Sequence, residues 1–227
     1  FSAVDMTKDE IKAIEEAYAK TETPVVSNNS AHRWTPDVPM VIPEINADHF
    51  AVIESQKKRL GTKRGFIAVK PNCSIQSYTP ALTAWKEFEP YEVVATTYQA
   101  ISGAGKTFKD WPEMEGNIIP YIGGEEEKSE KEPLRVWGEV KDGEIVPATT
   151  PVITCQCIQY LEEDNRPQVT LDVDYEGGMG VSIGRLREDT VYDWKFVGLS
   201  HNTLRGAAGG AVLCAETLKA QGFITKK

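Results

Sequence analysis

The fold is decided by the stretch Phe66-Ile67-Ala68-Val69-Lys70-Pro71-Asn72-Cys73-Ser74, which joins a strand to a helix. Its first four residues form an unbroken apolar run, which is typical of a strand buried on both faces. A helical pattern follows the stretch and continues to about Phe88. A strand that leads directly into a helix indicates an α/β fold.

Cys73 lies at this strand-to-helix junction. Free backbone amides and the helix dipole at such a position stabilise a thiolate, which makes the cysteine a nucleophile. The same amides can hold the oxyanion of an attacked carbonyl. A buried structural cysteine is the other interpretation, and it is the commoner fate of a lone cysteine. Asn72 beside it, together with a glycine-containing turn after the next predicted strand, favours the nucleophile.

Further helices are predicted on either side of this junction. A capping box, Thr7-Lys8-Asp9-Glu10, opens an amphipathic helix over 7–20. Another helix, over 47–60, ends at Gly61. The last predicted helix, over 203–220, is rich in alanine and glycine on one side, which permits close approach to another backbone.

Strand patterns recur along the chain, at 23–26, 92–97, 134–140, 152–159, 181–187 and 194–199. The dipeptide Asp142-Gly143 predicts a hairpin turn between Val140 and Ile145. Residues 106–133 are polar, contain several prolines and are predicted to be irregular. Because helices flank the chain and strands fill its middle, we expect a central sheet that is mixed or mostly antiparallel.

The composition is that of an ordinary globular protein and disfavours several classes. The chain has 227 residues, of which 41% are hydrophobic and 26% charged, and this argues against disorder and disulfide-dense scaffolds. It shows no signal-peptide pattern and no apolar run near the ~18 residues of a membrane span. The net charge of −9 disfavours nucleic acid or an anionic membrane as partners. The spacing of the four cysteines fits neither zinc nor a redox pair, so we expect no metal site and a cytoplasmic protein.

Three more motifs contain residue types suited to ligands. Ser102-Gly103-Ala104-Gly105 lets backbone approach a ligand, although most such turns are only turns. Glu126 and Lys128 lie two apart on a segment expected to be extended, where they would face one zwitterionic or phosphorylated substrate. A solvated charge run is the plainer interpretation of that pair. Residues 202–209 open the last helix, where small residues suit an anion or cofactor site as well as tight packing.

Four segments occur in the order Pro71-Asn72-Cys73-Ser74, 97–105, 117–128 and 200–209. In residues and in order they resemble the aspartate-semialdehyde dehydrogenase family, in the branch found in archaea, fungi and some bacteria. The resemblance covers nearly the whole chain. It implies that Cys73 accepts the acyl group and that Gln99 orients it. Asn72 and Glu126 would contact the substrate, Glu126 at its amine, and Lys128 would contact its phosphate. NADP would be bound by residues from three segments: Ser27, Asn28, Ser102, Gly103, Gly105 and Asn202.

The resemblance also implies two domains and a reaction. Residues 1–70 and 202–227 would be the remainder of a dinucleotide-binding, Rossmann-like domain. Residues 71–201 would form an α+β catalytic and dimerisation domain with a mixed, largely antiparallel sheet. A homodimer or homotetramer of such chains would reduce L-aspartyl 4-phosphate to L-aspartate 4-semialdehyde with NADPH, on the route to lysine, threonine and methionine.

The sequence departs from the family pattern in two places. Family members begin with a strand and a glycine-rich loop that binds pyrophosphate, whereas this chain begins at Phe1-Ser2-Ala3, which resembles a later strand end of that domain. The family also has an arginine that clamps the substrate and a Gly-His that supplies a general base. Here residues 154–157 should lead into that segment, but 158–164 resembles sequence well beyond it. We therefore expect clamp and base to be absent, and loss of a base costs ~10²–10⁴-fold in rate.

Two other functions remain open at this point. A non-catalytic oligomerisation or regulatory paralogue would account for the missing arginine and histidine. A related reductase, acting on a malonyl thioester or on acetylglutamyl phosphate, would share the thiolate chemistry. The pair Glu126 and Lys128 favours an aminated, phosphorylated substrate over these.

Overall fold

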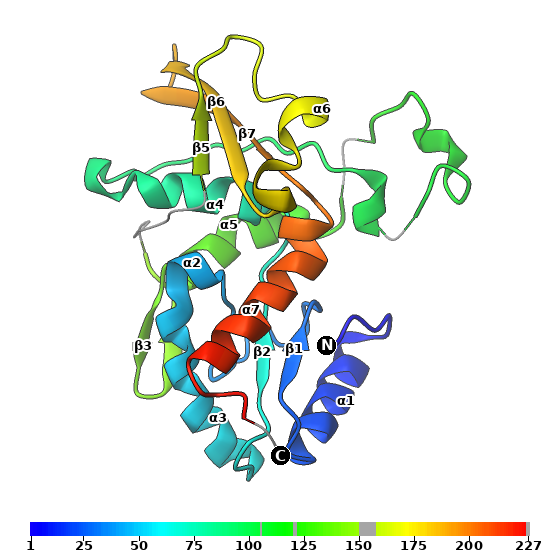
Figure 1. The fold of residues 1–227 in the computed structure, drawn as a ribbon, viewed down its shortest axis with the longest axis vertical. Coiled ribbons are helices and arrows are strands. Elements are labelled where there is room, and N and C mark those ends of the chain that lie inside the picture. The colour runs from blue at the N-terminus through cyan, green and yellow to red at the C-terminus, as the bar shows by residue number, and fades with distance from the viewer. Residues whose placement is uncertain (105, 120–121, 150–157, 226–227) are drawn as a thin grey trace.

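The computed structural model describes residues 1–104, 106–119, 122–149 and 158–225 (Figure 1). Its α-helices are α1 (Lys8–Lys20), α2 (Pro43–Asn46), α3 (Ile53–Leu60), α4 (Ile75–Ala84), α5 (Glu125–Val136), α6 (Val169–Asp172) and α7 (Gly209–Ala220). Its strands are β1 (Val25–Ser27), β2 (Ile67–Val69), β3 (Glu139–Lys141), β4 (Glu144–Val146), β5 (Ile158–Leu161), β6 (Val181–Glu188) and β7 (Trp194–Ser200). Among the helices described, none has the length and apolar character needed to cross a membrane.

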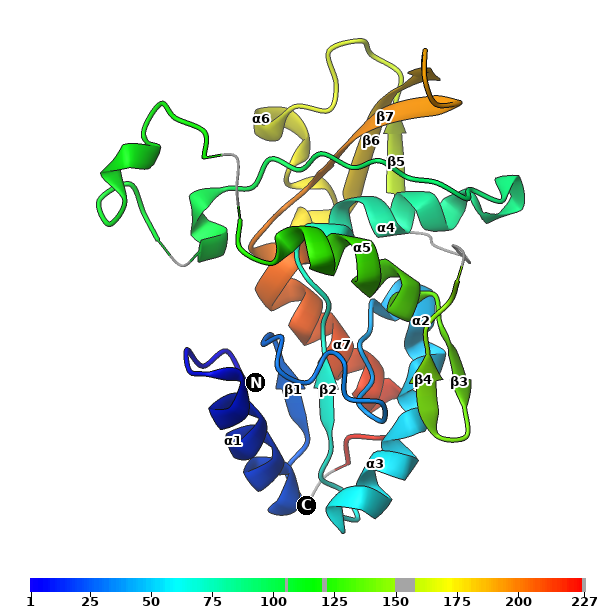
Figure 2. The same ribbon diagram turned by 180° about the vertical axis from the view of Figure 1, so that it is seen from behind.

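The lower part of the molecule is built on the parallel pair β1 and β2, in which Val25 lies opposite Ile67. Every residue of both strands is buried, because α1, α3 and α7 surround the pair (Figures 1 and 2). The aromatic rings of Phe50 and Phe66 both pack against that of Phe223, with centroids 6.0 and 6.4 Å apart. The predicted strand at 66–69, buried on both faces, is therefore confirmed.

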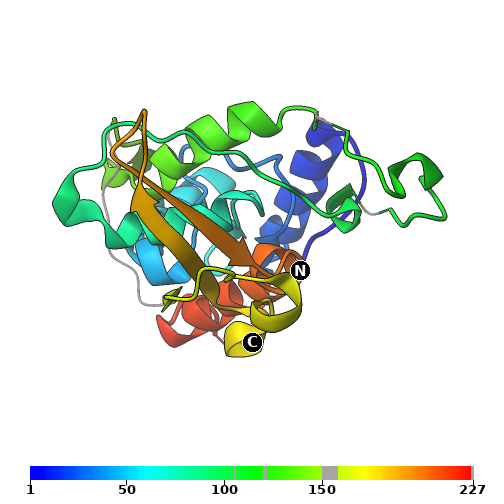
Figure 3. The ribbon, with the colours of Figure 1, turned by 90° about the horizontal axis from the view of Figure 1, so that it is seen from above.

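The upper part contains a three-stranded sheet in the order β5-β6-β7. β5 runs parallel to β6, and β7 runs antiparallel to it (Figure 3). Helix α4 packs on one face of the sheet, where Ala81 contacts a buried cluster with Val181 and Ile183. The predicted strands at 181–187 and 194–199, and the mixed character of the sheet, are confirmed.

Local sequence signals gave reliable boundaries. Thr7 and Glu10 form the complete capping box at the start of α1. Gly61 ends α3 with φ +70°, a left-handed conformation that glycine adopts without strain. Asp142 and Gly143 both have positive φ, at 52° and 81°, as a tight hairpin turn between β3 and β4 requires.

Three predictions of secondary structure are wrong. Residues 92–97 form no strand and pair with no described strand, and Val93 and Val94 are exposed. Residues 106–133 are not irregular throughout, because α5 begins at Glu125; three glutamates in its first turn lie favourably at the positive end of the helix dipole. The predicted strand over 134–140 is wrong in part: its residues 134–136 belong to α5, and only residues 139 and 140 belong to β3. Of the predicted strand 152–159, residues 158 and 159 lie in β5 and the others lie outside the described residues.

Candidate active site

Cys73 lies in the short link between β2 and α4, where the lower and upper parts of the molecule meet (Figure 1). Its thiol is free and its side chain is partly exposed. The helical segment Leu204–Ala208, which leads into α7, approaches it closely, since a Cβ on Gly206 would lie 2.8 Å from the Cβ of Cys73. Only glycine permits that approach, so the predicted close contact of the glycine-rich helix is confirmed.

Gln99 contacts the thiol of Cys73. The thiol donates to Gln99 Oε1 over 3.8 Å, and Gln99 Nε2 donates to Glu125 Oε1 over 2.8 Å. Because Glu125 accepts from the amide nitrogen, the amide oxygen is turned toward the sulfur. The structure thus brings together the two residues that the sequence analysis nominated as catalytic.

Glu125, the first residue of α5, binds side chains of the link between β2 and α4 as well as Gln99. Its carboxylate accepts hydrogen bonds from Ser74 Oγ at 2.6 Å and from Asn72 Nδ2 at 2.8 Å, in addition to Gln99. Burial alone would raise the pKa of Glu125, but these hydrogen bonds outweigh it and the pKa lies below its usual value. The group is therefore a carboxylate at neutral pH, at the edge of the Cys73 site.

The predicted pairing of Glu126 with Lys128 on an extended segment is wrong, because both residues lie on α5. Residues three apart are neighbours on a helix, and Lys128 Nζ lies 3.7 Å from Glu125 Oε2. Glu126 points elsewhere and is exposed. A helical interpretation of this segment would have identified Glu125 and Glu132, seven residues apart, as one face of the helix.

Glu132 holds the backbone of the same link and was missed by the sequence analysis. It accepts from Asn72 N at 2.6 Å and from Arg33 Nη1 at 3.0 Å. Arg33 also donates to the carbonyl oxygens of Lys70 and Asn28, at 3.1 and 3.3 Å. Nothing in the sequence around Arg33 indicates this role, because two of its partners, Lys70 and Glu132, come from distant segments.

Two of the predicted cofactor-binding segments meet near Cys73. Asn202 Nδ2 donates to Ser102 Oγ over 3.2 Å, and a Cβ on Gly103 would lie 3.5 Å from the same nitrogen. A Cβ on Gly206 would lie 3.5 Å from Asn202 Oδ1, which places this amide beside the contact with Cys73. Gly105, the remaining residue of that turn, lies outside the described residues.

Ser27 and Asn28 lie at the carboxyl end of β1. The Ser27 hydroxyl is fully buried and donates to Glu15 Oε1 at 2.5 Å, so it fixes the chain rather than facing a cleft. Asn28 differs, since its Oδ1 is buried and has no hydrogen-bond partner among the described residues. A buried acceptor without a donor is costly, so this atom suits a ligand that brings one.

The three histidines all have other partners. His32 Nδ1 lies 3.0 Å from Thr35 Oγ1, and His49 Nε2 lies 2.9 Å from the carbonyl oxygen of Gly138. His201 Nδ1 accepts from the backbone at the start of the last helical segment. Among the described residues, no histidine is hydrogen-bonded to the Cys73 thiol.

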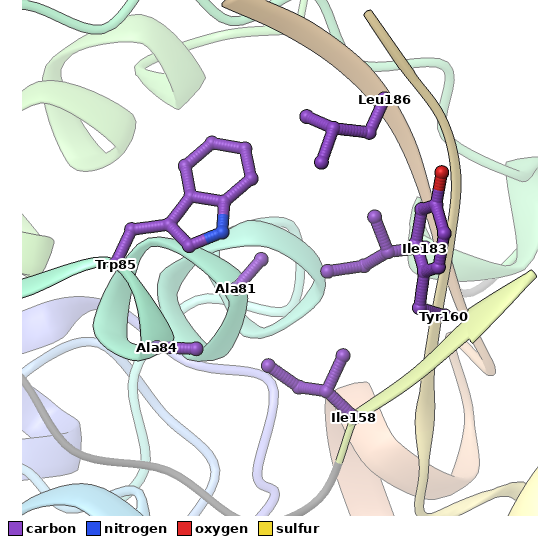
Figure 4. A pocket seen from close by; sticks show the side chains of 7 residues that line it. All are labelled: Ala81, Ala84, Trp85, Ile158, Tyr160, Ile183 and Leu186. Carbon is purple, nitrogen blue, oxygen red and sulfur yellow. The ribbon is translucent and has the colours of Figure 1, made fainter. Parts of the chain in front are cut away.

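A separate apolar cavity of about 330 Å³ lies between α4 and the sheet (Figure 4). Its lining is Ala81, Ala84, Trp85, Ile158, Tyr160, Ile183 and Leu186. The lining carries few polar groups and no carboxylate, thiol or ammonium group, so it is not suited to the acyl chemistry of Cys73.

Two family models match the chain. One is described as semialdehyde dehydrogenase, NAD binding domain, over residues 1–53, and the other as semialdehyde dehydrogenase, dimerisation domain, over residues 82–160. With a free cysteine at the strand-to-helix junction, fold and site define an oxidoreductase of the semialdehyde dehydrogenase class.

Similar proteins narrow this class. The aspartate-semialdehyde dehydrogenase of Methanothermobacter thermautotrophicus is 36% identical over 249 positions, covering 86% of this chain and 70% of that protein. The crystal structure of the Candida albicans enzyme with NADP matches with a TM-score of 0.78 at 33% identity, covering 96% of this chain and 77% of that one. The malonyl CoA reductase (NADP) of Metallosphaera sedula is 33% identical over 267 positions, covering 94% and 74%. The chain belongs to the aspartate-semialdehyde dehydrogenase family, and its predicted fold class is confirmed.

Both alignments are longer than the 227 residues of this chain. The relatives therefore carry residues inside the aligned region that this chain lacks. This agrees with the predicted loss of an internal segment.

Proposed function

We propose that this chain reduces L-aspartyl 4-phosphate to L-aspartate 4-semialdehyde with NADPH, in the biosynthesis of lysine, threonine and methionine. The observation that carries the proposal is the partly exposed Cys73 thiol, 3.8 Å from the amide oxygen of Gln99. The names of the relatives supply the reaction, and the local geometry is suited to it.

In this proposal Cys73 attacks the acyl phosphate as a thiolate, phosphate leaves, and a thioester forms on the sulfur. Gln99 orients the acyl group, because Glu125 fixes the amide that faces the sulfur. NADPH supplies the hydride that reduces the thioester. The thiolate leaves as the aldehyde forms, and Cys73 is ready for a second cycle.

We propose Glu125 and Lys128 as the charged contacts of the substrate. One carboxylate and one ammonium, 3.7 Å apart and only partly exposed, suit a substrate with an amine and a phosphate. Glu126, expected in this role from the resemblance, lies on the exposed side of the helix and is less suited. Asn72 contributes through Glu125, whose carboxylate it holds.

The described residues fit a nicotinamide cofactor next to Cys73. Asn202, Ser102 and Gly103 form one side of its proposed site, and the unpartnered Asn28 Oδ1 suits the carboxamide of the ring. Ser27 acts there by fixing the turn that carries Asn28. We propose NADP rather than NAD, because the structure of the Candida albicans relative is described with NADP.

We also propose the domain division and assembly inferred from the resemblance. Residues 1–70 and 202–227 would bind the cofactor, and residues 71–201 would hold the substrate and form the contacts of a homodimer or homotetramer. The match of a dimerisation model over residues 82–160 supports this assembly. A nucleophile that must stay reduced suits the cytoplasm.

Reduction of a malonyl thioester is the second candidate, since one relative at 33% identity is named for it. The Cys73 chemistry would be the same. The contact between Glu125 and Lys128 favours the aminated, phosphorylated substrate. Purified chain given each substrate with NADPH distinguishes the two, by which one oxidises the cofactor faster.

Alkylation with iodoacetamide tests the proposal directly. Burial raises the pKa of the Cys214 thiol to about 12, so Cys214 serves as an unreactive internal control. We expect Cys73 to be labelled first, as judged by peptide mass spectrometry, and to be protected by aspartate semialdehyde. Equal labelling of the four cysteines, or labelling of Cys73 without protection, would contradict the proposal and favour a non-catalytic paralogue.

A further inference from the structure

A buried lysine lies next to the nucleophile and has no part in the reaction proposed above. Lys70 follows β2 and is only 4% exposed. Its Nζ donates to the carbonyl oxygen of Pro71 over 2.8 Å. The amino group is thus held against the backbone of the link that carries Cys73, two residues before the sulfur.

The neighbouring charges leave this amino group without a counter-ion. Arg33 and Glu132 pair with each other at 3.0 Å, and both side chains are buried. Arg33 donates to the carbonyl oxygen of Lys70 itself, so a second positive charge lies close by. Within the described part of the chain, no carboxylate oxygen lies within 4.0 Å of Lys70 Nζ, so the ammonium forms no ion pair there.

Burial, and then the charge of Arg33, lower the pKa of Lys70 to about 7. Negative charge on Cys73 and on Glu132 acts in the opposite direction and raises it. The lysine therefore changes its charge near neutral pH, and whether it does so depends on the state of Cys73.

We propose that Lys70 is a positioning residue for Cys73. The ammonium form of Lys70, held inside the link between β2 and α4, stabilises the Cys73 thiolate by its charge. The proposal rests on the proposed role of Cys73 as nucleophile. Negative charge on Cys73 favours the ammonium form of Lys70, and in this proposal the ammonium in turn favours the thiolate. Gln99, which faces the sulfur, is neutral, and Glu125 on the far side of Gln99 is paired with Lys128.

The test is the rate of Cys73 alkylation by iodoacetamide between pH 5 and 10, in the full chain and in Lys70→Gln. Glutamine keeps a donor for the Pro71 carbonyl and removes the charge. We expect the pH of half-maximal rate to rise by about one unit, which slows labelling about tenfold at lower pH. Lys131→Gln removes an exposed lysine and serves as the matched control, which should leave the profile unchanged. A profile that is the same in Lys70→Gln and the full chain would overturn the proposal.

A measurement on the unaltered protein keeps the proposal testable should Lys70→Gln fail to fold. Titration of Lys70 Nζ by NMR is followed before and after Cys73 is alkylated. Removing the thiolate should lower the pH midpoint of Lys70, and an unmoved midpoint would refute the coupling. Failure of the proposed function looks different, because Cys73 is then no more reactive than the other cysteines at any pH.

Discussion

The β1-β2 pair and the β5-β6-β7 sheet differ in how completely they are covered. β1 and β2 are buried at every residue, between helices on both sides. In the β5-β6-β7 sheet the first half of β6 is buried on both faces, whereas Tyr160, Trp194 and Val197 are 52%, 56% and 42% exposed. The apolar cavity lies beside this second sheet (Figure 4).

The difference indicates where each sheet obtains its stability. A sheet buried on both faces is complete within one chain, and single substitutions in it are felt strongly. The second sheet leaves apolar surface open, and such surface commonly marks an interaction site. Of these exposed residues, Tyr160 lies within residues 82–160 that the dimerisation model matches, whereas Trp194 and Val197 lie beyond them.

The largest predicted effect compares a large-to-small substitution in each region. Phe66→Ala removes a fully buried ring that packs against Phe223 and should cost about 3–5 kcal/mol of unfolding free energy. Leu186→Ala at the cavity wall should cost less than about 1 kcal/mol, because its side chain is already poorly packed. Urea unfolding of the two variants measures the difference. Equal losses would mean that both regions are equally well packed.

The next effect concerns the link between the regions. Glu132→Gln leaves the buried Arg33 without its counter-charge and should cost about 2–3 kcal/mol, as measured by urea unfolding. Glu127→Gln on the exposed side of the same helix is the control and should have no measurable effect. A small loss in Glu132→Gln would show that the link is held mainly by other contacts.

For Gly206→Ala we predict a smaller loss of stability and a slower alkylation of Cys73. The added Cβ would lie 2.8 Å from that of Cys73, so either the helix or the cysteine must move, at a cost of about 1–2 kcal/mol. Alkylation of Cys73 should slow, whereas Ala208→Ser, at an exposed position of the same segment, should leave it unchanged. Unaltered alkylation of Cys73 in Gly206→Ala would show that the contact with Gly206 does not affect the reactivity of the thiol.

The smallest predicted effect is a gain. Ala84→Leu adds apolar volume to the cavity wall and should stabilise the chain by about 0.5–1 kcal/mol in thermal unfolding. The matched control is Ala13→Leu on the exposed side of α1, because leucine at that position does not line the cavity. If both variants behave alike, the cavity is not a packing defect that one side chain can repair.

Short-range chemistry made much of the fold predictable. The capping box of α1, the stop at Gly61 and the turn at Asp142-Gly143 each depend on a few adjacent residues. The apolar run of β2 predicts a buried strand. The predicted strand over 92–97 failed because a strand needs a partner, and local pattern alone does not supply one. The helix α5 was missed because its glutamates suggested a solvated charge run, although acidic residues suit the first turn of a helix.

Sequence alone identified the family, the cysteine and the glutamine that faces it, because these depend on residue types in a recognisable order. Only the folded chain showed that Glu125 and not Glu126 turns toward Cys73, that Arg33 and Glu132 hold the link, and that Lys70 is buried without a counter-ion. These facts depend on which distant segments meet and which charges lose their water. Contacts of that kind are made by packing, and the order of residues along the chain does not record them.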